Sequence, residues 1–404
     1  MKVLISCYAC SPYQGSEPGM GWNFVSAIAE HHEVHVVVES KFQQDIARYF
    51  SEHPAEKPFI HFYFIGKRRH RLLRKIWPPS YYWFYKKWQK KVYDFACKLE
   101  EKEHFDVVHQ LNMIGYREPG YLWQMNKPLV WGPIGGFQMT PWRFLPSLGV
   151  KGCMYYWIRN VMNLWQMNHL RRVMIMSKRA DVIISATQDS YEVITKQWKR
   201  DSIIIPEVGL TEIPSAQSET KDDGKLHLCW SGLHIPRKAL NLLIEAIAKS
   251  KLKNKIVLHV IGEGEYTHRW KTLAERQHLK SIVWHGWVSR QEALQIMKRA
   301  DVFVITSMAD ATSTVLLEAL SLGLPVIAPN LFGFKNVITP DCGIKIDVHS
   351  KSQVVSDLAS AIDYLCENEK ERLSLSKGAF KRAQDFTWEK KAEAINAIYE
   401  KVVN

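Results

Sequence analysis

The chain has 404 residues, which exceeds the usual size of one domain, so we expect two domains. Hydrophobic residues make up 46% of it and charged residues 24%, which excludes a disordered or fibrous protein. No apolar run approaches the roughly 20 residues of a membrane-spanning helix, and the apolar start MKVLISCYAC is too short for a signal peptide. The 7 scattered cysteines suit reduced thiols, so we expect a cytoplasmic protein.

The net charge of +13 is concentrated in the first half of the chain. Residues 1–200 hold 28 Lys and Arg against 16 Asp and Glu, whereas residues 201–404 hold 26 against 25. A positive field of this kind attracts an anionic partner, which is a phosphorylated ligand, a nucleic acid or an acidic membrane surface.

Short apolar runs alternate with longer amphipathic segments along the whole chain. In the first half the pattern predicts strands at VLISCY, VHVVVES, IHFYFIG, DVVHQL, LVWGPI and DVIISAT. In the second half it predicts them at LHLCWSG, IVLHVIG, SIVWHGW, DVFVIT, PVIAP and GIKIDV. Most of these runs are apolar throughout, which is typical of parallel strands buried on both faces. Strand–helix alternation predicts an α/β fold with right-handed crossovers.

A break divides this pattern. Residues 211–225, TEIPSAQSETKDDGK, carry no apolar period and are rich in Ser, Thr, Pro and charge, which indicates a linker. We therefore predict a doubly wound, Rossmann-like domain over 1–210 and a second over 226–385. Ligands of such sheets bind beyond the carboxyl ends of the strands, so two of them facing each other would form a deep inter-domain cleft.

The glycine-rich stretch CSPYQGSEPGMGWNFV (10–25) follows the first predicted strand. Glycines at 15, 19 and 21 would let the backbone approach a ligand closely and turn into a helix. The stretch is not G-x-G-x-x-G, so the sequence leaves a plain tight turn open as well.

The segment GKRRHRLLRKIWPPSYYWFYKKWQKKVYDF (66–95) holds 10 Lys or Arg and no acid between residues 67 and 91. Cations interleaved with Trp and Tyr suit the headgroup layer of an anionic membrane. They also suit stacking on RNA, and a solvated helix with one core face is the third interpretation.

The stretch VVHQLNMIGYREPG (107–120) ends a strand in a loop, with His109 at the strand end and Arg117 and Glu118 in the loop. A lone histidine in such a place is more often structural than catalytic. No D-x-D motif and no His/Cys cluster with metal-ligand spacing stands out, so we expect no metal.

The stretch VITSMADATSTVLLEALSLGLPVIAP (304–329) places two acids around a helix start. Thr312 and Ser313 are candidate N-caps, and free N–H groups at a helix start bind anions. Glu318 could accept hydrogen bonds from a vicinal diol such as a ribose, and Asp310 from another hydroxylated group. The pattern fits a nucleotide sugar; an ordinary helix with solvated acids stays open from the spacing alone.

This stretch resembles the E-x7-E segment of retaining glycosyltransferases of family 4 (glycosyltransferase group 1), which have the GT-B fold. The matching residues are Thr306-Ser307, Asp310-Ala311, Glu318-Ala319, Gly323 and Pro325-Val326-Ile327-Ala328. Further stretches resemble the family at 179–194, 203–210, 260–265, 284–304 and 383–402. The resemblance thus covers nearly the whole chain and implies the GT-B class, two Rossmann-like domains, with the last helix (386–404) packing on the first domain.

Two positions depart from the family pattern. Where the family has an Arg that grips the diphosphate, this chain has Leu233, and the sequence leaves open whether His234 or Arg237 supplies the charge. Asp310 stands in place of the first Glu of the motif. Because Asp is one methylene shorter, the contact with the donor sugar would shift by roughly 1 Å.

The resemblance implies a retaining transfer of a sugar from a nucleotide sugar to an acceptor hydroxyl, without a metal cofactor, in bacterial cell-surface polysaccharide or glycolipid assembly. It implies donor contacts at Gly15, Gly232, Arg237, Lys238, Gly262, Asp310, Thr312, Ser313, Thr314 and Glu318. It implies acceptor contacts at Glu17, Arg117 and Glu118, and catalytic candidates at His109, Glu118, Lys238 and Asp310.

The implied partners are a nucleotide sugar and a lipid-linked or saccharide acceptor, with an anionic membrane surface contacted through 66–95 and no nucleic acid. Two alternatives stay open at this point. One is a sugar-nucleotide epimerase of the same fold, and the other is an inactive nucleotide-sugar-binding protein, because Leu233 and Asp310 both depart from the pattern.

Overall fold

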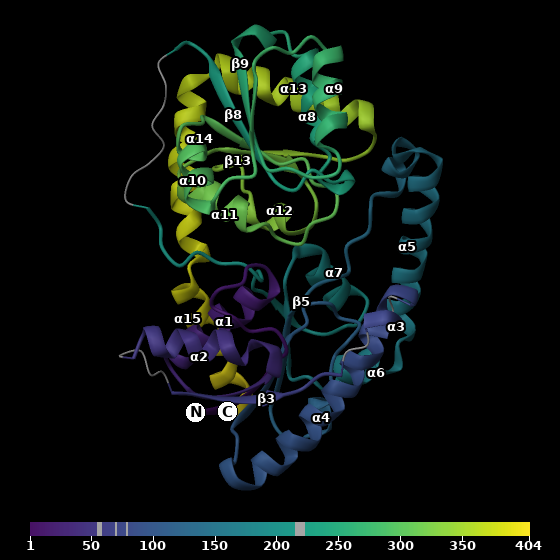
Figure 1. The fold of residues 1–404 in the computed structure, drawn as a ribbon, viewed down its shortest axis with the longest axis vertical. Helices are drawn as coiled ribbons and strands as arrows, with labels where there is room; N and C mark the ends of the chain where they lie inside the picture. The colour runs from purple at the N-terminus through teal and green to yellow at the C-terminus, as the bar shows by residue number, and fades with distance from the viewer. Residues whose placement is uncertain (55–58, 69–70, 78–79, 215–222) are drawn as a thin grey trace. The chain divides into compact units, whose positions relative to one another are not determined.

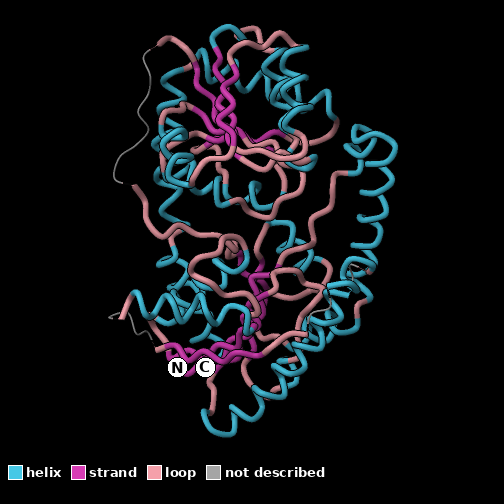
Figure 2. Tube along the Cα trace, viewed as in Figure 1, coloured by secondary structure: helices cyan, strands magenta, loops and turns pink. Residues whose placement is uncertain are grey.

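Two parallel β-sheets with helices on their faces organise the chain in the computed structural model, which describes residues 1–54, 59–68, 71–77, 80–214 and 223–404 (Figures 1 and 2). Each sheet is the centre of one compact unit. Unit 1 contains residues 1–137, 163–207 and 388–404, and unit 2 contains residues 138–162 and 208–387. The α/β class with two parallel sheets, predicted from the apolar runs, is confirmed, whereas the cleft between the domains stays a prediction.

Unit 1 has a seven-stranded sheet in the order β3-β2-β1-β4-β5-β6-β7. Its strands are β1 (Lys2–Cys7), β2 (Glu33–Glu39), β3 (Ile60–Ile65), β4 (Val107–Asn112), β5 (Leu129–Ile134), β6 (Val182–Ser185) and β7 (Ser202–Ile204). Its helices are α1 (Glu17–Ala29), α2 (Gln43–Glu52), α3 (Arg71–Ile76), α4 (Ser80–Glu103), α6 (Arg171–Arg179), α7 (Gln188–Lys196) and α15 (Trp388–Val403).

Unit 2 has a six-stranded sheet in the order β10-β9-β8-β11-β12-β13. Its strands are β8 (Leu226–Ser231), β9 (Ile256–Ile261), β10 (Ile282–Gly286), β11 (Val302–Val304), β12 (Val326–Pro329) and β13 (Gly343–Ile346). Its helices are α8 (Leu240–Lys249), α9 (Thr267–Arg276), α10 (Arg290–Lys298), α11 (Thr314–Ser321), α12 (Phe332–Val337), α13 (Lys351–Glu367) and α14 (Glu369–Ala383). Helix α5 (Gly149–His169) begins in unit 2 and ends in unit 1.

Twelve of these strands coincide with the predicted apolar runs, and the strand that the pattern missed is β7, which has only 3 residues. The apolar runs are continuous because both faces of each strand are buried. In β8, for example, Leu228 and Trp230 pack into one core layer and Cys229 packs into the other. Residues 138–162, which the sequence placed in the first domain, cluster with residues 208–387 in unit 2. Of the predicted linker, residues 215–222 lie outside the described part.

Helix α15 at the end of the chain belongs to unit 1. The ring of Trp388 lies 5.0 Å from that of Phe24 on α1, and the hydroxyl of Tyr399 lies 2.5 Å from His109 Nδ1 on β4. The last helix therefore covers part of one face of the unit 1 sheet, to which the first strand of the chain also belongs.

The glycines after β1 have different structural roles. A Cβ at Gly21 would lie 2.1 Å from the carbonyl oxygen of Ala9 and 2.7 Å from Cys7 Sγ, so α1 can pack here only without a side chain. A Cβ at Gly19 would lie 2.6 Å from the carbonyl oxygen of Gln14, whereas one at Gly15 would meet nothing within 4 Å. Packing therefore requires Gly21 and Gly19 but places no demand on Gly15.

We predict that Gly21→Ala destabilises the protein by roughly 1–3 kcal/mol, because the added methyl group must push α1 away from β1. Gly15→Ala is the matched control, and it should leave the midpoint of thermal unfolding nearly unchanged. Equal midpoints for the two variants would contradict the packing account of Gly21.

Candidate functional site

Each sheet has one point where the strand order reverses, and the candidate site residues follow the strands on either side of it. In unit 2 the neighbouring strands β8 and β11 occupy this position. The sheet continues from β8 to β9 and β10 on one side, and from β11 to β12 and β13 on the other. The loops 232–239 and 305–313 therefore leave the carboxyl edge of the sheet side by side. In open α/β sheets this crevice is the usual place of a ligand.

Hydrogen bonds from the second loop fix the backbone of the first. Thr306 Oγ1 donates to the carbonyl oxygen of Lys238 at 2.6 Å, and Thr306 in turn accepts from Trp230 Nε1 at 3.0 Å. The carbonyl oxygen of Arg237 accepts from the amide of Met308 at 2.8 Å. Arg237 and Lys238 thus lie in a short 3₁₀ turn, Pro236–Lys238, whose position the loop after β11 determines.

Three charged side chains meet at this point, and we call them the switch-point cluster: Arg237, Lys238 and Asp310. Lys238 Nζ lies 2.5 Å from Asp310 Oδ2, and Arg237 binds the other oxygen, Oδ1. Arg237 also donates to the carbonyl oxygen of Ala309 at 3.0 Å. Burial would raise the pKa of Asp310, but the positive charges of Lys238 and Arg237 outweigh it and the pKa is lowered. The cluster therefore carries one net positive charge.

The structure distinguishes His234 from Arg237, the two residues that could supply the charge missing at Leu233. His234 is buried, its Nδ1 lies 2.8 Å from Thr267 Oγ1, and burial together with the charge of Lys271 lowers its pKa to about 4. A histidine that is neutral at pH 7 cannot replace an arginine. Leu233 is itself 45% exposed. The second cation of the cluster is therefore Arg237.

Glu318 lies in the second turn of α11 and is almost completely buried. Its Oε1 accepts from Arg290 Nε at 2.7 Å, and the Arg290 side chain is 73% exposed. Arg290 is thus the exposed partner of this pair and Glu318 the buried one, so the carboxylate needs a partner whereas the arginine can turn into solvent. A ligand with two hydroxyl donors could therefore replace Arg290 as the partner of the Glu318 carboxylate.

The residues before α11 form the rest of this edge. Ser313 is the N-cap residue, with no hydrogen bond from its side chain to the helix, and Thr314 is exposed. Thr312 is buried beside Gly333, where an added Cβ would lie 2.2 Å from Thr312 Oγ1. The helix start therefore has amide groups that point out of α11 beside the switch-point cluster.

Gly232 and Gly262 bring two loops into backbone contact. Gly262 has φ of 109°, and a Cβ there would lie 2.2 Å from the carbonyl oxygen of Gly232. Both features require glycine at 262. The two predicted donor-contact glycines thus position the loops after β8 and β9 against each other.

A cavity of about 800 Å³ lies in unit 2 beside the switch-point cluster. Arg237, Met308 and Ala309 form its border with the cluster, and its wall includes Arg269, Arg276 and Lys351. Glu318 does not line it. This cavity therefore lies on the α8–α9 side of the cluster, away from the residue that the sequence assigns to the ribose.

In unit 1 the strand order reverses between β1 and β4. The loop after β1 leads to Glu17, whose Oε1 accepts from the amide of Ile114 in the loop after β4 at 2.9 Å. Burial raises the pKa of Glu17, against the opposing effects of this hydrogen bond and of Lys41. Glu17 thus connects the two loops that border the switch point of this sheet.

Arg117 and Glu118 both have protein partners. Arg117 Nε donates to Gln166 Oε1 at 2.5 Å, Nη1 donates to the carbonyl oxygen of Gly136 at 3.2 Å, and Nη2 donates to Asn163 Oδ1. Glu118 lies 3.0 Å from Arg172, and burial raises its pKa while Arg172 lowers it. Arg117 holds the loop after β4 to the C-terminal part of α5, which is a structural role. The pKa of Glu118 is raised, as is common for acid–base groups, so Glu118 stays a candidate for that role.

His109 lies in the middle of β4, paired with Ile5 on one side and Val130 on the other, and it is completely buried. Its Nε2 donates to the carbonyl oxygen of Gly132 at 2.7 Å, and its Nδ1 accepts from the hydroxyl of Tyr399 at 2.5 Å. Burial lowers its pKa to about 4. A substrate cannot reach either nitrogen, so the predicted catalytic role does not fit, and His109 instead attaches α15 to the sheet.

The basic aromatic segment combines core and surface residues. Trp88 and Tyr85 are completely buried, and Trp88 Nε1 donates to the carbonyl oxygen of Ile65 at 2.7 Å. Trp88, one of the aromatic residues that the sequence suggested for a membrane headgroup layer, therefore belongs to the core instead. Other large side chains of the segment are at least 44% exposed: Leu72, Ile76, Trp77, Tyr82 and Trp83. Residues 69–70 and 78–79 of the segment lie outside the described part of the chain.

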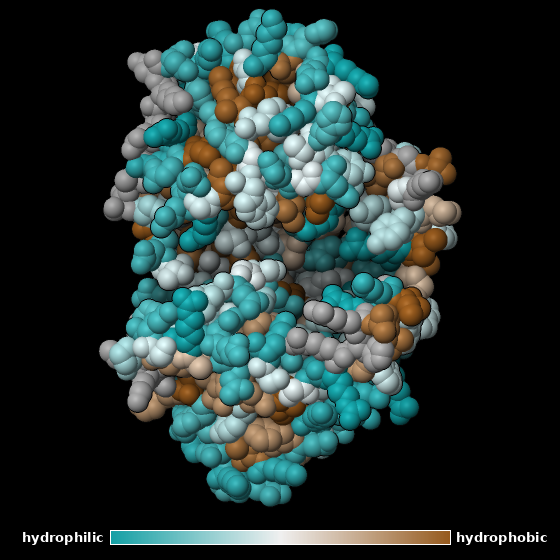
Figure 3. Space-filling view, in the orientation of Figure 1, coloured by the Kyte–Doolittle hydropathy of each residue, from teal (hydrophilic) through white to brown (hydrophobic). Residues whose placement is uncertain are grey.

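Helix α5 has a second exposed apolar surface, which the sequence analysis did not single out. Its side chains that are at least 50% exposed are Val150, Met154, Tyr155, Trp157, Ile158 and Trp165. Figure 3 shows hydrophobic side chains at the surface along the course that α5 takes in Figure 1. Among the described helices, none combines the length and the hydrophobicity that crossing a bilayer requires.

Sequence reasoning missed two of the site's neighbours, Arg290 and Arg172. The pairing of Arg290 with Glu318 depends on α10 beginning at residue 290, after the capping box of Ser289 and Glu292. That capping box, Ser-x-x-Glu, is visible in the sequence and was the available signal. No local pattern connects Arg172 with Glu118.

Residues 213–382 match the family model described as Glycosyl transferases group 1, which covers less than half of the chain. Among curated relatives, the lipopolysaccharide glucosyltransferase WaaG of Escherichia coli (strain K12) is 30% identical over 135 residues, 32% of this chain and 36% of that protein. The chain spans about half of the length of the curated relatives it matches first, from 36% to 61%. Residues 213–382 of this chain are thus similar to group 1 glycosyltransferases.

Solved structures share the fold over nearly the whole chain. The apo form of the lipopolysaccharide outer core galactosyltransferase WaaB has a TM-score of 0.65 and 16% identity, with 99% of this chain and 100% of that chain covered. HepE from Anabaena, in complex with UDP, has a TM-score of 0.61 and 14% identity, with coverage of 99% and 100%. The predicted fold class, GT-B with two Rossmann-like domains, is confirmed.

The buried neutral state of His109 generates a prediction about acid stability. Its pKa is about 4 in the folded chain and about 6.5 in an unfolded one, so the unfolded state binds more protons between these values. The contribution to stability is therefore present above pH 6.5 and is lost as pH falls toward 4, by up to about 3 kcal/mol.

We predict that His109→Gln, compared with wild type, loses less stability between pH 7 and pH 4.5 in urea unfolding. The exposed His349 provides the control, since His349→Gln should retain the wild-type pH dependence. The same pH dependence in His109→Gln and wild type would contradict the burial account.

Proposed function

We propose that this protein is a retaining glycosyltransferase that moves a hexosyl group from a nucleotide sugar to an acceptor hydroxyl. The observation that carries the proposal is the switch-point cluster with Glu318 beside it: two cations and a helix start at the edge where a diphosphate would lie, and a buried carboxylate near them. The match of residues 213–382 to group 1 glycosyltransferases supports it.

In this proposal Lys238 and Arg237 bind the diphosphate of the donor. Negative charge grows on the diphosphate as the glycosidic bond breaks, so cations placed there stabilise the transition state more than the bound substrate. The amide groups of Thr312, Ser313 and Thr314 at the start of α11 add donors for the same oxygens. With these cations in place, we propose that the transfer needs no metal ion.

Asp310 holds the two cations in position when no donor is bound, through the ion pairs of the switch-point cluster. When the diphosphate takes over these cations, the carboxylate of Asp310 can accept from a hydroxyl of the donor sugar. Its shorter side chain would then select how deeply the sugar lies.

For the acceptor we propose Glu17 and Glu118 of unit 1. Both are carboxyl groups whose pKa burial raises, which is the state that a group handling the proton of a hydroxyl requires. Arg117 is a weaker candidate than the sequence suggested because its guanidinium group already donates to Gln166, Gly136 and Asn163.

The two alternatives receive less support. An epimerase would use the same cluster but no acceptor, and the named relatives are transferases. An inactive binding protein was suggested because Leu233 and Asp310 depart from the family pattern. In our proposal Arg237 takes the place of the arginine that is missing at position 233, and Asp310 binds both Arg237 and Lys238.

We further propose a role in assembling a cell-surface polysaccharide or glycolipid at the cytoplasmic face of a membrane. WaaG and WaaB, which act on lipopolysaccharide by their names, are the relatives that support it. The exposed apolar side chains of α3, α4 and α5 and the basic half of the chain suit an anionic membrane surface.

The donor assignment is tested by titrating UDP-, GDP-, ADP- and CMP-sugars against wild type, Glu318→Gln and Arg290→Gln by calorimetry. We predict that Glu318→Gln weakens the binding of the preferred donor by roughly 1.5–3 kcal/mol, about 10- to 150-fold, because a charged acceptor for the ribose is lost.

Arg290→Gln is the matched control because it breaks the same ion pair from the other side. It should leave donor affinity unchanged or raise it, since the ribose no longer competes with Arg290. If both variants lose affinity equally, the ion pair itself matters and Glu318 does not bind the ribose.

The membrane proposal is tested by sedimentation with vesicles that contain anionic lipid. Wild type should sediment at low salt and be released as salt screens the attraction, each engaged cation contributing about 1 kcal/mol. Reversing four exposed lysines of α4 should abolish sedimentation: Lys86, Lys87, Lys90 and Lys91. Reversing four exposed lysines of unit 2 is the control and should not: Lys249, Lys251, Lys253 and Lys255. Wild type that stays in the supernatant would refute membrane binding.

A further inference from the structure

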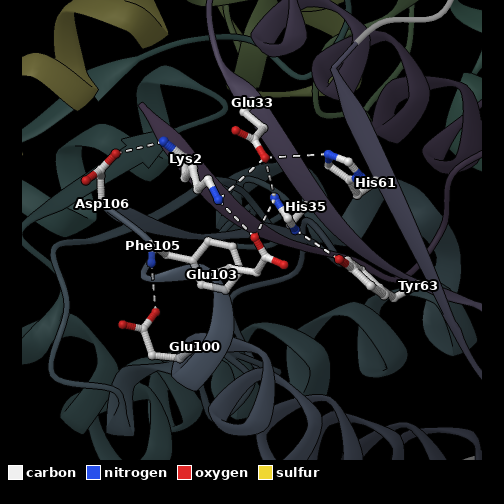
Figure 4. A network of polar contacts seen from close by, with 9 residues as sticks. All are labelled: Lys2, Glu33, His35, His61, Tyr63, Glu100, Glu103, Phe105 and Asp106. Carbon is white, nitrogen blue, oxygen red and sulfur yellow. Dashed lines mark hydrogen bonds and ion pairs between the residues drawn. The ribbon is translucent and has the colours of Figure 1, made fainter.

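The amino end of the sheet in unit 1 carries a cluster of charged and imidazole side chains that the proposed function does not use (Figure 4). We call it the amino-edge cluster, and its members are Glu33 and His35 on β2, His61 on β3 and Glu103 at the end of α4. The candidate site residues follow β1 and β4 at the opposite, carboxyl edge.

Strand register brings these residues together. His35 and His61 are direct partners in the parallel ladder of β2 and β3. Glu33 precedes His35 by two residues, and Tyr63 follows His61 by two, so all four side chains project from the same face of the sheet. The last turn of α4 covers this face and adds Glu103, as Figure 4 shows.

The distances match those between ligands of one metal ion. Glu33 Oε1 lies 3.1 Å from His35 Nε2 and 3.5 Å from His61 Nε2, and Glu103 Oε2 lies 3.9 Å from His35 Nε2. The ligand atoms of Glu33, His35 and His61 all lie within 4.8 Å of one another. Ligands about 2.0–2.1 Å from a tetrahedral Zn²⁺ are about 3.3–3.4 Å apart, so the cluster needs only small movements to surround an ion.

His35 has the surroundings of a metal ligand. It is buried, and burial lowers its pKa although the hydrogen bond to Glu33 acts in the opposite direction. This favours the neutral imidazole, whose nitrogen lone pair can bind a metal. Its Nδ1 lies 3.0 Å from the hydroxyl of Tyr63. When Nε2 binds a metal, Nδ1 carries the proton and donates it to an oxygen of this kind, which fixes the orientation of the ring.

Lys2 is the natural competitor for the same place. Its Nζ lies 2.9 Å from Glu103 Oε2 and 3.7 Å from Glu33 Oε1, so its ammonium group neutralises the carboxylates that a metal would bind. The backbone amide of Lys2 is held by Asp106 at 2.7 Å, whereas its side chain is 36% exposed and can swing into solvent. A divalent cation would therefore exchange with the ammonium group.

We infer that the amino-edge cluster binds one divalent transition-metal ion, with Zn²⁺ the ion whose ligand preferences it fits: two imidazoles and two carboxylates. Oxygen-preferring ions such as Mg²⁺ fit less well because half of the donors are nitrogens. The ion would fasten β2, β3 and α4 together at the edge of the sheet away from the candidate site, so its role is structural. No metal was expected from the sequence, because His35 and His61 lie far apart in the chain. The register of β2 and β3 brings the two histidines together.

The test is a calorimetric titration of Zn²⁺ into the full chain, freed of any affinity tag and treated with a chelator. Wild type should bind one ion per chain with saturation, and Co²⁺ in its place should show the visible absorption of a tetrahedral site. His61 is half exposed, so His61→Ala should fold normally while its affinity for Zn²⁺ falls at least about tenfold.

Two further variants distinguish a metal site from a network of ion pairs. Lys2→Ala should bind Zn²⁺ more tightly than wild type, because the competing ammonium group is gone, and His349→Ala, which removes an exposed histidine elsewhere, should bind as wild type does. The inference is overturned if wild type shows no saturable binding. It is also overturned if His61→Ala binds as tightly as wild type, or if Lys2→Ala only lowers thermal stability without any gain in affinity.

Discussion

Parallel pairing is the constraint on which the rest of this molecule depends, because it makes every strand of a sheet end at the same edge. In both units the carboxyl edge collects the loops, and the reversal of strand order leaves one crevice in each: between β8 and β11, and between β1 and β4. The charged residues of the candidate site follow these four strands. The amino edges are left for structural contacts, which is where the amino-edge cluster lies.

At the β8–β11 edge, electrostatics determines what can bind. Two cations share one carboxylate, and hydrogen bonds from Thr306 and Met308 fix the backbone that carries the cations. In the proposed function this arrangement is preorganised, because the loop that would hold the diphosphate is already fixed by these hydrogen bonds. The carboxylate of Glu318 is also fixed in place, since it is buried and bound by Arg290, whose side chain is exposed and could give way to a ligand in the proposed function.

The sequence predicted the strands well because their residues are buried on both faces. Local spacing placed Asp310 and Glu318 on one loop and helix, whereas Lys238 was expected only from the resemblance to the glycosyltransferase family. The sequence could not predict what depends on register and side-chain direction. His109 was placed at a strand tip, whereas the ladder puts it opposite Ile5 and Val130 with both nitrogens engaged. Trp88 lies in the core and Trp83 at the surface, although both belong to one aromatic run. The partners of His35 and His61 follow from strand pairing, which no local spacing reveals.

The ion pairs of Asp310 have a consequence for selectivity among anions. The carboxylate of Asp310 belongs to the same chain as Lys238 and Arg237, so it binds these cations as an internal ligand at a very high effective concentration. A free phosphate, sulfate or unrelated polyanion that approaches Lys238 and Arg237 must compete with this internal ligand and brings no other contact to compensate. A nucleotide sugar brings a ribose, a base and a sugar as well, so its total binding energy can exceed that of the internal competitor. In the proposed function, Asp310 would thus act as a filter that keeps the two cations away from the abundant small anions of the cell.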